Sequence, residues 1–132
     1  MNWMRHIFAL ALVPGVASAD PAPGSMQPYR DKNRIVLVAG PGMGDANIAA
    51  QRQVFQSHRA GFKERDLLFF EALGEPGARA RAEFKLDGKH FTVLLIGKDG
   101  EVKVKSDKPL TADFLFGTID AMPMRKEEMK RR

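Results

Sequence analysis

Three largely apolar runs lie between residues 35 and 96, and a turn signal follows each of them. The first run, Ile35 to Ala39, precedes a Gly-Pro-Gly turn, and the others are Asp66 to Leu73 and Phe91 to Ile96. Short runs of this kind, rich in β-branched residues, are typical of strands that are buried on both faces of a sheet. The pattern therefore predicts a central sheet covered by helices.

A fourth segment, Glu101 to Lys105, alternates valine with lysine directly after Asp99-Gly100. An Asp-Gly pair between two strand patterns favours a tight hairpin. Exposed lysines protect an edge strand from pairing with other chains. We therefore expect a half-exposed fourth strand, antiparallel to the third, at one edge of the sheet.

Helical patterns separate these strands. We expect a helix between the N-cap residue Asp45 and the stop signal Gly61, and a weakly helical segment over residues 78–86. A final helix opens near Thr111 and ends at Pro123. A right-handed crossover makes the first two strands parallel. The expected fold class is α/β and thioredoxin-like, a four-stranded mixed sheet in the order β-α-β-α-β-β-α with helices on both faces.

Residues 1–19 have the features of a secretory signal peptide. Arg5 precedes an apolar run from Ile7 to Val13, and the small residues Ala17-Ser18-Ala19 form a cleavage site. Pro14-Gly15 interrupts the run, which is shorter than the roughly 20 apolar residues needed to cross a bilayer. A membrane anchor is the weaker alternative. We expect cleavage after Ala19, a periplasmic or secreted protein, and no transmembrane segment after cleavage.

The remaining chain divides into three segments. Residues 20–32 contain three prolines and few apolar positions, which predicts a flexible lead-in. Residues 33–123 form the expected thioredoxin-like domain. Residues 124–132 are a basic C-terminal tail, for which we expect a solvated end and consider a binding arm the alternative.

Composition limits the chemistry. The 132 residues include no cysteine, so thiol-disulfide exchange and thiol peroxidation by this chain are excluded. The formal net charge is +5, and much of the excess lies in the C-terminal tail without the interleaved aromatic residues of a nucleic-acid platform. We expect a monomer that has no nucleic-acid partner.

Residues 92–96 with Lys98-Asp99-Gly100 resemble the strand and turn that follow the cis-proline of thioredoxins. Phe91 stands in the place of that proline. The strand at Ile35 resembles the one that leads into the CxxC motif, which places Asp45 and Ile48 at about the two cysteine positions. Both hallmarks of thioredoxin chemistry are therefore missing.

A closer resemblance spans nearly all of the chain beyond the leader. It is carried by Asn33 to Val38, Arg65 to Leu67, Phe91 to Gly100 and Ile119 to Arg125. These segments resemble the bacterial exported domain-of-unknown-function family 4174, which is related to domains of the animal extracellular proteins equarin and the sushi-repeat and coiled-coil-containing matrix group. The resemblance implies architecture and export, and no established reaction.

Thioredoxin-like folds place their active edge where the first strand meets its helix, beside the loop that precedes the third strand. Here that edge offers Gly42, Met43, Asp45, His90 and Phe91, which we select as candidate binding residues. We expect no catalytic residue, metal ligand or cofactor. The predicted function is a binding or structural module of the cell envelope, with a protein or peptide partner at this loop edge.

Several alternatives stay open. The fold alone would allow a diverged oxidoreductase that does not use its own thiols. Asp45 and His90 could form a general-base pair, although no nucleophile accompanies them. The glycines between Gly40 and Gly44 invite a phosphate loop, but no Gly-Lys-Ser/Thr follows. Met122, Met124 and Met129 allow a Cu(I) site, and core packing plus a solvated tail explains them better.

Overall fold

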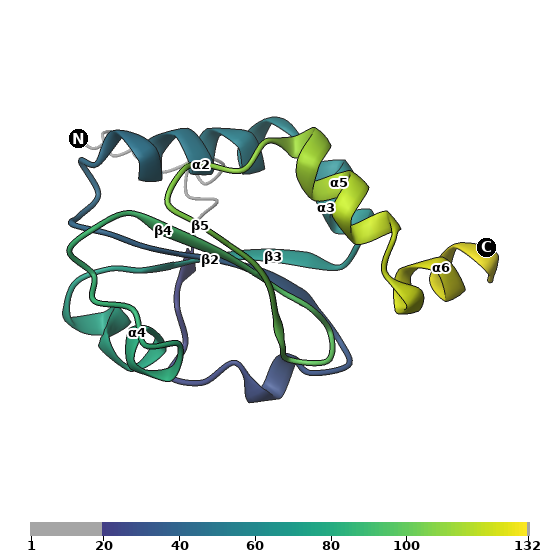
Figure 1. The fold of residues 1–132 in the computed structure, drawn as a ribbon, viewed down its shortest axis with the longest axis horizontal. Helices are drawn as coiled ribbons and strands as arrows, with labels where there is room; N and C mark the ends of the chain where they lie inside the picture. The colour runs from purple at the N-terminus through teal and green to yellow at the C-terminus, as the bar shows by residue number, and fades with distance from the viewer. Residues whose placement is uncertain (1–19, 132) are drawn as a thin grey trace, which may run out of the picture.

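The computed structural model describes residues 20–131, so the predicted signal peptide and its cleavage site lie outside the described residues. The described chain forms one open sheet with helices on both faces (Figure 1). The strands are β1 (Asp20–Pro21), β2 (Arg34–Ala39), β3 (Leu67–Ala72), β4 (Thr92–Ile96) and β5 (Val102–Ser106). Their order across the sheet is β1-β3-β2-β4-β5. The mixed α/β class is therefore confirmed.

Strand directions follow the predicted connections. β3 runs parallel to β1 and β2, and β4 is antiparallel to β2 and β5. Every residue of β2 is buried, as expected for a central strand covered on both faces. Among the described strands, β5 pairs with β4 alone, and Lys103 and Lys105 are exposed at this edge.

The predicted strand count was wrong, because the sheet has five strands rather than four. The additional strand is β1, in which Asp20 lies opposite Phe70 and Pro21 opposite Glu71. The segment after it contains a 3-10 helix, η3 (Gln27–Tyr29), and buries Ala22. Residues 20–32 thus contribute a two-residue strand, a 3-10 helix and the buried side chains of Ala22 and Met26 to the domain.

One face of the sheet carries α2 (Ala46–Ser57), α3 (Arg59–Glu64) and α5 (Ala112–Asp120) (Figure 1). The predicted single helix up to Gly61 is in fact two helices. Gly61 lies inside α3 rather than ending a helix, and a Cβ there would meet the Phe116 ring at 2.6 Å. This glycine therefore permits close packing of α3 against α5.

The core on this face is built from strand and helix side chains together: Val36, Val38, Ile48, Phe62, Leu67, Phe69, Phe91, Val93, Leu95, Leu110, Ala112, Leu115 and Ile119. A smaller core on the opposite face lies under η4 (Glu75–Gly77) and α4 (Ala78–Glu83). Its members are Ala22, Met26, Ile35, Leu37, Phe70, Ala72, Ala80, Leu94 and Ile96.

The C-terminal segment is the helix α6 (Pro123–Lys130), which extends from one end of the molecule (Figure 1). The preceding helix α5 ends at Asp120, before the predicted end at Pro123, and Pro123 instead opens α6, because proline fits the first helical position. Arg125 is buried against the domain. The segment is thus helical and held to the domain through Arg125 and Glu128, while most of its other side chains are exposed to solvent. Within residues 20–131, no helix combines the length and apolarity required to span a membrane.

Candidate functional site

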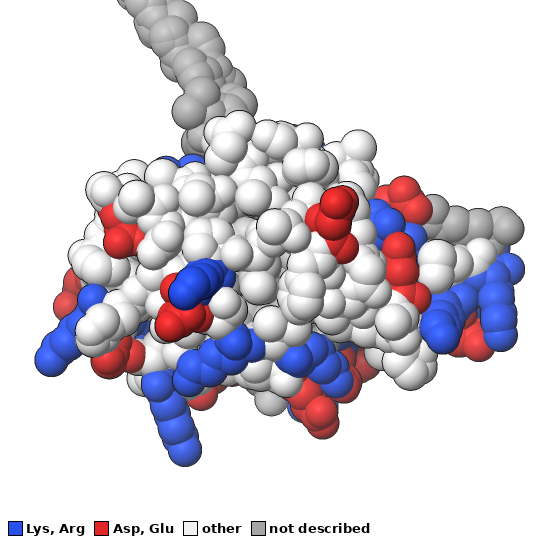
Figure 2. Space-filling model, turned by 45° about the horizontal axis from the view of Figure 1, so that its top comes forward, with Lys and Arg blue, Asp and Glu red and all other residues white. Residues whose placement is uncertain are grey.

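Charged residues from segments far apart in the sequence meet at the end of the sheet where β2 begins. The topology explains this meeting, because β2 starts beside the start of β3 and beside the end of the antiparallel β4. We call this group the ion-pair cluster; its members are Arg34, Glu64, Arg65, Asp66, Lys98, Asp120, Arg125 and Glu128. Figure 2 shows acidic and basic side chains mixed at the end of the molecule that carries α6.

Glu128 links α6 to two strands of the sheet. Its carboxylate accepts hydrogen bonds from Arg34 Nη1 and Nη2 at 3.2 and 3.1 Å, and from Lys98 Nζ at 2.7 Å. Arg34 is fully buried and 8% of Lys98 is exposed. Burial raises the pKa of Glu128, but the hydrogen bonds from Arg34 and Lys98 outweigh burial and lower this pKa from 4.5 to about 2. The carboxylate is therefore ionised over the whole physiological pH range.

Arg125 connects α6 to α3 and α5. Its Nε donates to Asp120 Oδ1 and its Nη2 donates to Glu64 Oε2, both at 3.0 Å. Asp120 also accepts two hydrogen bonds from Arg65, at 3.0 and 2.9 Å. The bond from Arg65 is the largest cause that lowers the pKa of Asp120. Acids and bases balance within the cluster, so its evident role is to fix α6 on the domain.

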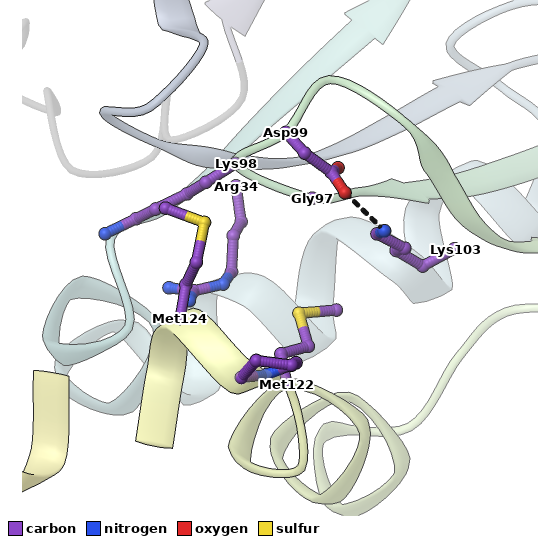
Figure 3. A pocket seen from close by; sticks show the side chains of 8 residues that line it. Arg34, Gly97, Lys98, Asp99, Lys103, Met122 and Met124 are labelled. Atoms are coloured by element: carbon purple, nitrogen blue, oxygen red, sulfur yellow. Dashed lines mark hydrogen bonds and ion pairs between the residues drawn. The ribbon is translucent and has the colours of Figure 1, made fainter. Parts of the chain in front are cut away.

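A small cavity of about 70 Å³ lies next to the cluster (Figure 3). It is lined by Arg34, Gly97, Lys98, Asp99, Lys103, Met122, Pro123 and Met124. The Nε atom of Arg34 is buried and has no hydrogen-bond partner, although the other two nitrogens of this guanidinium are bonded. Arg34 thus brings to the cavity wall a guanidinium in which one N–H has no acceptor.

The predicted loop edge lies at the other end of the sheet. The topology brings its two loops together, since Ala39 pairs with Thr92 and a Cβ on Gly40 would lie 3.5 Å from Phe91 Cα. Phe91 itself is buried in the core and presents no side chain for binding. The Asp45 carboxylate caps α2, accepting from the N–H groups of Asn47 and Ile48 at 3.1 Å. Its role here is structural.

The other candidates of the loop edge are exposed. His90 Nδ1 lies 3.5 Å from a carboxylate oxygen of Asp87, and 82% of the His90 side chain is exposed. The structure thus gives His90 a partner other than Asp45 and offers no support for a general-base pair. Met43 is 70% exposed, and space around Gly42 is open. Binding at this edge stays a prediction.

A larger groove of about 350 Å³ opens where β3 begins. It is lined by Asn33, Phe55, Arg59, Lys63, Asp66, Leu67 and Leu68. Arg59 and Lys63 are exposed on α3, whereas Leu67 is buried at the start of the strand. The groove therefore combines apolar side chains with two basic residues, Arg59 and Lys63, and one acidic residue, Asp66.

The methionines proposed for Cu(I) divide between two environments. Met122 is half-buried against the core, and it lines the small cavity together with Met124. Met129 is exposed on α6 and is not part of that lining. Among residues 20–131, no three His, Cys, Asp or Glu residues are grouped as metal ligands would be.

The ion-pair cluster was not predicted from the sequence. The partners are too far apart in the chain, since 94 positions separate Arg34 from Glu128. One signal was present, because these charged residues flank strand ends that the predicted topology places at the same end of the sheet.

By its fold and its ion-pair cluster, the described chain is an α/β domain with an open, mixed sheet, and ion pairs fix its C-terminal helix to the domain. Residues 25–128 match a family model described as a domain of unknown function, DUF4174. This match covers most of the chain, so the protein belongs to the DUF4174 family. A search of curated proteins found no match.

Proposed function

We propose that this protein is an exported, thioredoxin-like binding module that takes an extended peptide beside β3. The strand-helix-strand unit followed by a hairpin and a helix supports the thioredoxin-like assignment. The leader pattern in residues 1–19 supports a periplasmic or secreted location. The resemblance to domains of equarin and of the sushi-repeat matrix group belongs to the same proposal and agrees with an extracellular binding role.

The observation that carries the proposal is the uncovered start of β3. The register of β1 reaches only Phe70 and Glu71, so Leu67 to Phe69 have no β1 partner within residues 20–131. The carbonyl of Glu71 accepts a hydrogen bond from the Ala22 N–H, on the β1 side of β3. The carbonyl of Asp66 accepts one from the Arg34 N–H, on the β2 side. Along a strand, the backbone N–H and C=O groups of successive residues point to opposite sides. The N–H and C=O groups of Leu67 and Phe69 therefore point toward the uncovered edge.

The groove described above lies at this uncovered edge, with Leu67 and Leu68 in its wall. A peptide can add to such an edge as a further strand, gaining backbone hydrogen bonds while alternate side chains enter pockets. Phe55 and Leu67 favour an apolar side chain in the groove. Lys63 and Arg59 at the rim favour acidic residues beside it. The expected partner is thus an extended peptide with an acidic and apolar pattern.

A displayed library of random linear peptides tests this proposal. We expect selection of acidic and apolar sequences whose binding weakens about tenfold in Lys63→Glu, since a like charge then faces the acidic peptide. Lys105→Glu makes the same charge change on β5, at the opposite edge of the sheet, and should bind like the unaltered protein. Failure to select any peptide would overturn the proposed function.

A second variant, Met43→Glu with His90→Ala, separates the groove from the predicted loop edge. Both side chains are exposed, so the fold should tolerate the changes. If the selected peptides no longer bind this variant but still bind Lys63→Glu, the binding site lies at the loop edge. Loss in Lys63→Glu alone would support the β3 groove.

A further inference from the structure

The cavity beside Arg34 contains a donor that the protein itself does not satisfy. Arg34 Nη1 donates to the Arg65 carbonyl at 2.9 Å and, like Nη2, to Glu128. Within residues 20–131, the buried Nε is the one nitrogen of this guanidinium that has no acceptor. A buried N–H without an acceptor costs about 1 to 3 kcal/mol, so such groups call for an explanation. An acceptor placed in the cavity would provide one.

The first turn of α6 supplies a second, independent feature of the same cavity. Met122 is the N-cap residue of this eight-residue helix, and no side chain caps the helix there. The N–H groups of Met124 and Arg125 consequently have no intrahelical acceptor. No acidic residue lies in the first turn to complement the positive end of the helix dipole. Met122, Pro123 and Met124 form one wall of the cavity.

Basic side chains outnumber acidic ones in the cavity wall, although Lys98 is paired with Asp66 and Glu128, and Lys103 with Asp99 and Glu101. Lys98 and Lys103 line it, and among the lining residues Asp99 is the only acid. The Asp99 carboxylate already accepts from Lys103 Nζ at 2.6 Å and from the Glu101 N–H at 3.0 Å (Figure 3). Its pKa is lowered chiefly by the bond from Lys103. Glu128, the nearby acid of the cluster, is occupied by Arg34 and Lys98.

We propose that this cavity binds a single small oxyanion, with the chemistry shared by phosphate, sulfate and carboxylate. The anion accepts from Arg34 Nε, lies at the start of α6 and is attracted by Lys103. A helix N-terminus joined to cationic side chains is a general arrangement for holding such anions. The volume of about 70 Å³ excludes larger ligands such as nucleotides. This site is independent of the peptide groove and extends beyond the proposed function.

Titration of the protein with inorganic phosphate, followed by amide chemical shifts, tests the proposal. Saturable shifts are expected at Gly97 to Asp99 and at Met122 to Arg125. Gly97→Ala should weaken them, because the added Cβ would lie 2.7 Å from Lys103 Cε and 3.0 Å from Asp99 Oδ1 and would displace these two side chains of the cavity wall. Gly117→Ala is the matched control, since a Cβ there meets nothing within 4 Å and phosphate binding should persist.

A second variant tests the charge contribution. Lys103→Gln should weaken phosphate binding about tenfold, the loss expected for one charge-assisted interaction. Parallel titrations with sulfate and acetate distinguish a tetrahedral anion from a carboxylate as the preferred ligand. Absence of saturable shifts with all three anions would overturn the proposal. Equal binding by the unaltered protein and Gly97→Ala would overturn it as well, because the anion would then lie elsewhere.

Discussion

Glu128 is expected to stabilise the fold in a manner that depends on pH. Its pKa is 4.5 in the absence of the fold and about 2 within the ion-pair cluster. At about 1.4 kcal/mol per pKa unit this displacement corresponds to about 3 kcal/mol. Partial exposure, 15% of the side chain, allows solvent screening and reduces the expected value to about 2 kcal/mol.

The sign follows from the direction of the displacement. Because the folded-state pKa is lowered, the stabilisation is fully present above pH 4.5 and is lost as the pH falls toward 2. Glutamine imitates the protonated acid in shape and charge. Glu128→Gln should therefore lower the free energy of unfolding by about 2 kcal/mol at neutral pH, and its difference from the unaltered protein should vanish near pH 2.

Urea unfolding followed by far-ultraviolet circular dichroism, repeated at pH values from neutral to 2, measures this difference. Glu127→Gln is the matched control, because Glu127 is a neighbour on α6 whose side chain is 61% exposed and pairs with Lys130 at 3.6 Å. The control should change stability by less than about 0.5 kcal/mol at any pH. A Glu128→Gln variant whose deficit stays constant across this range would refute the reasoning about the cluster.

Two further substitutions test the packing described above. Gly61→Ala should destabilise the fold by about 1 to 3 kcal/mol, because its methyl group overlaps the Phe116 ring. The control Gly117→Ala should be neutral or stabilising. Thermal unfolding measures the stability of both variants. Gln51→Leu should cost about 2 to 4 kcal/mol, because the buried amide both accepts from the Leu110 N–H and donates to its carbonyl. Retained stability in chemical denaturation would contradict that reading.

The central sheet could be predicted from the sequence because its strands are encoded locally. The apolar run at Ile35 and the Asp99-Gly100 turn each specify their structure within a few residues. The short strand β1 carries no such pattern, since two residues cannot show a period. Pro123 was ambiguous for a different reason, because proline ends one helix and opens another equally well.

The candidate sites were less accessible to sequence reasoning. Asp45 was recognised as a cap, and its carboxylate does cap α2. Phe91 begins a run predicted to be a buried strand, and its burial in the core agrees with that pattern rather than with its selection as a binding residue. The ion-pair cluster and the cavity beside Arg34 depend on α6 returning to the sheet. That contact joins residues 94 positions apart, and only the folded chain reveals it.

Hydrogen exchange in the presence of a selected peptide tests the central claim most directly. If the peptide adds as a strand beside β3, the backbone amides of Leu67 and Phe69 gain protection when it binds. Amides at the loop edge, residues 42–45 and 89–91, should then exchange as in the free protein. Protection confined to the loop edge, with no change at Leu67 and Phe69, would contradict the proposed binding surface.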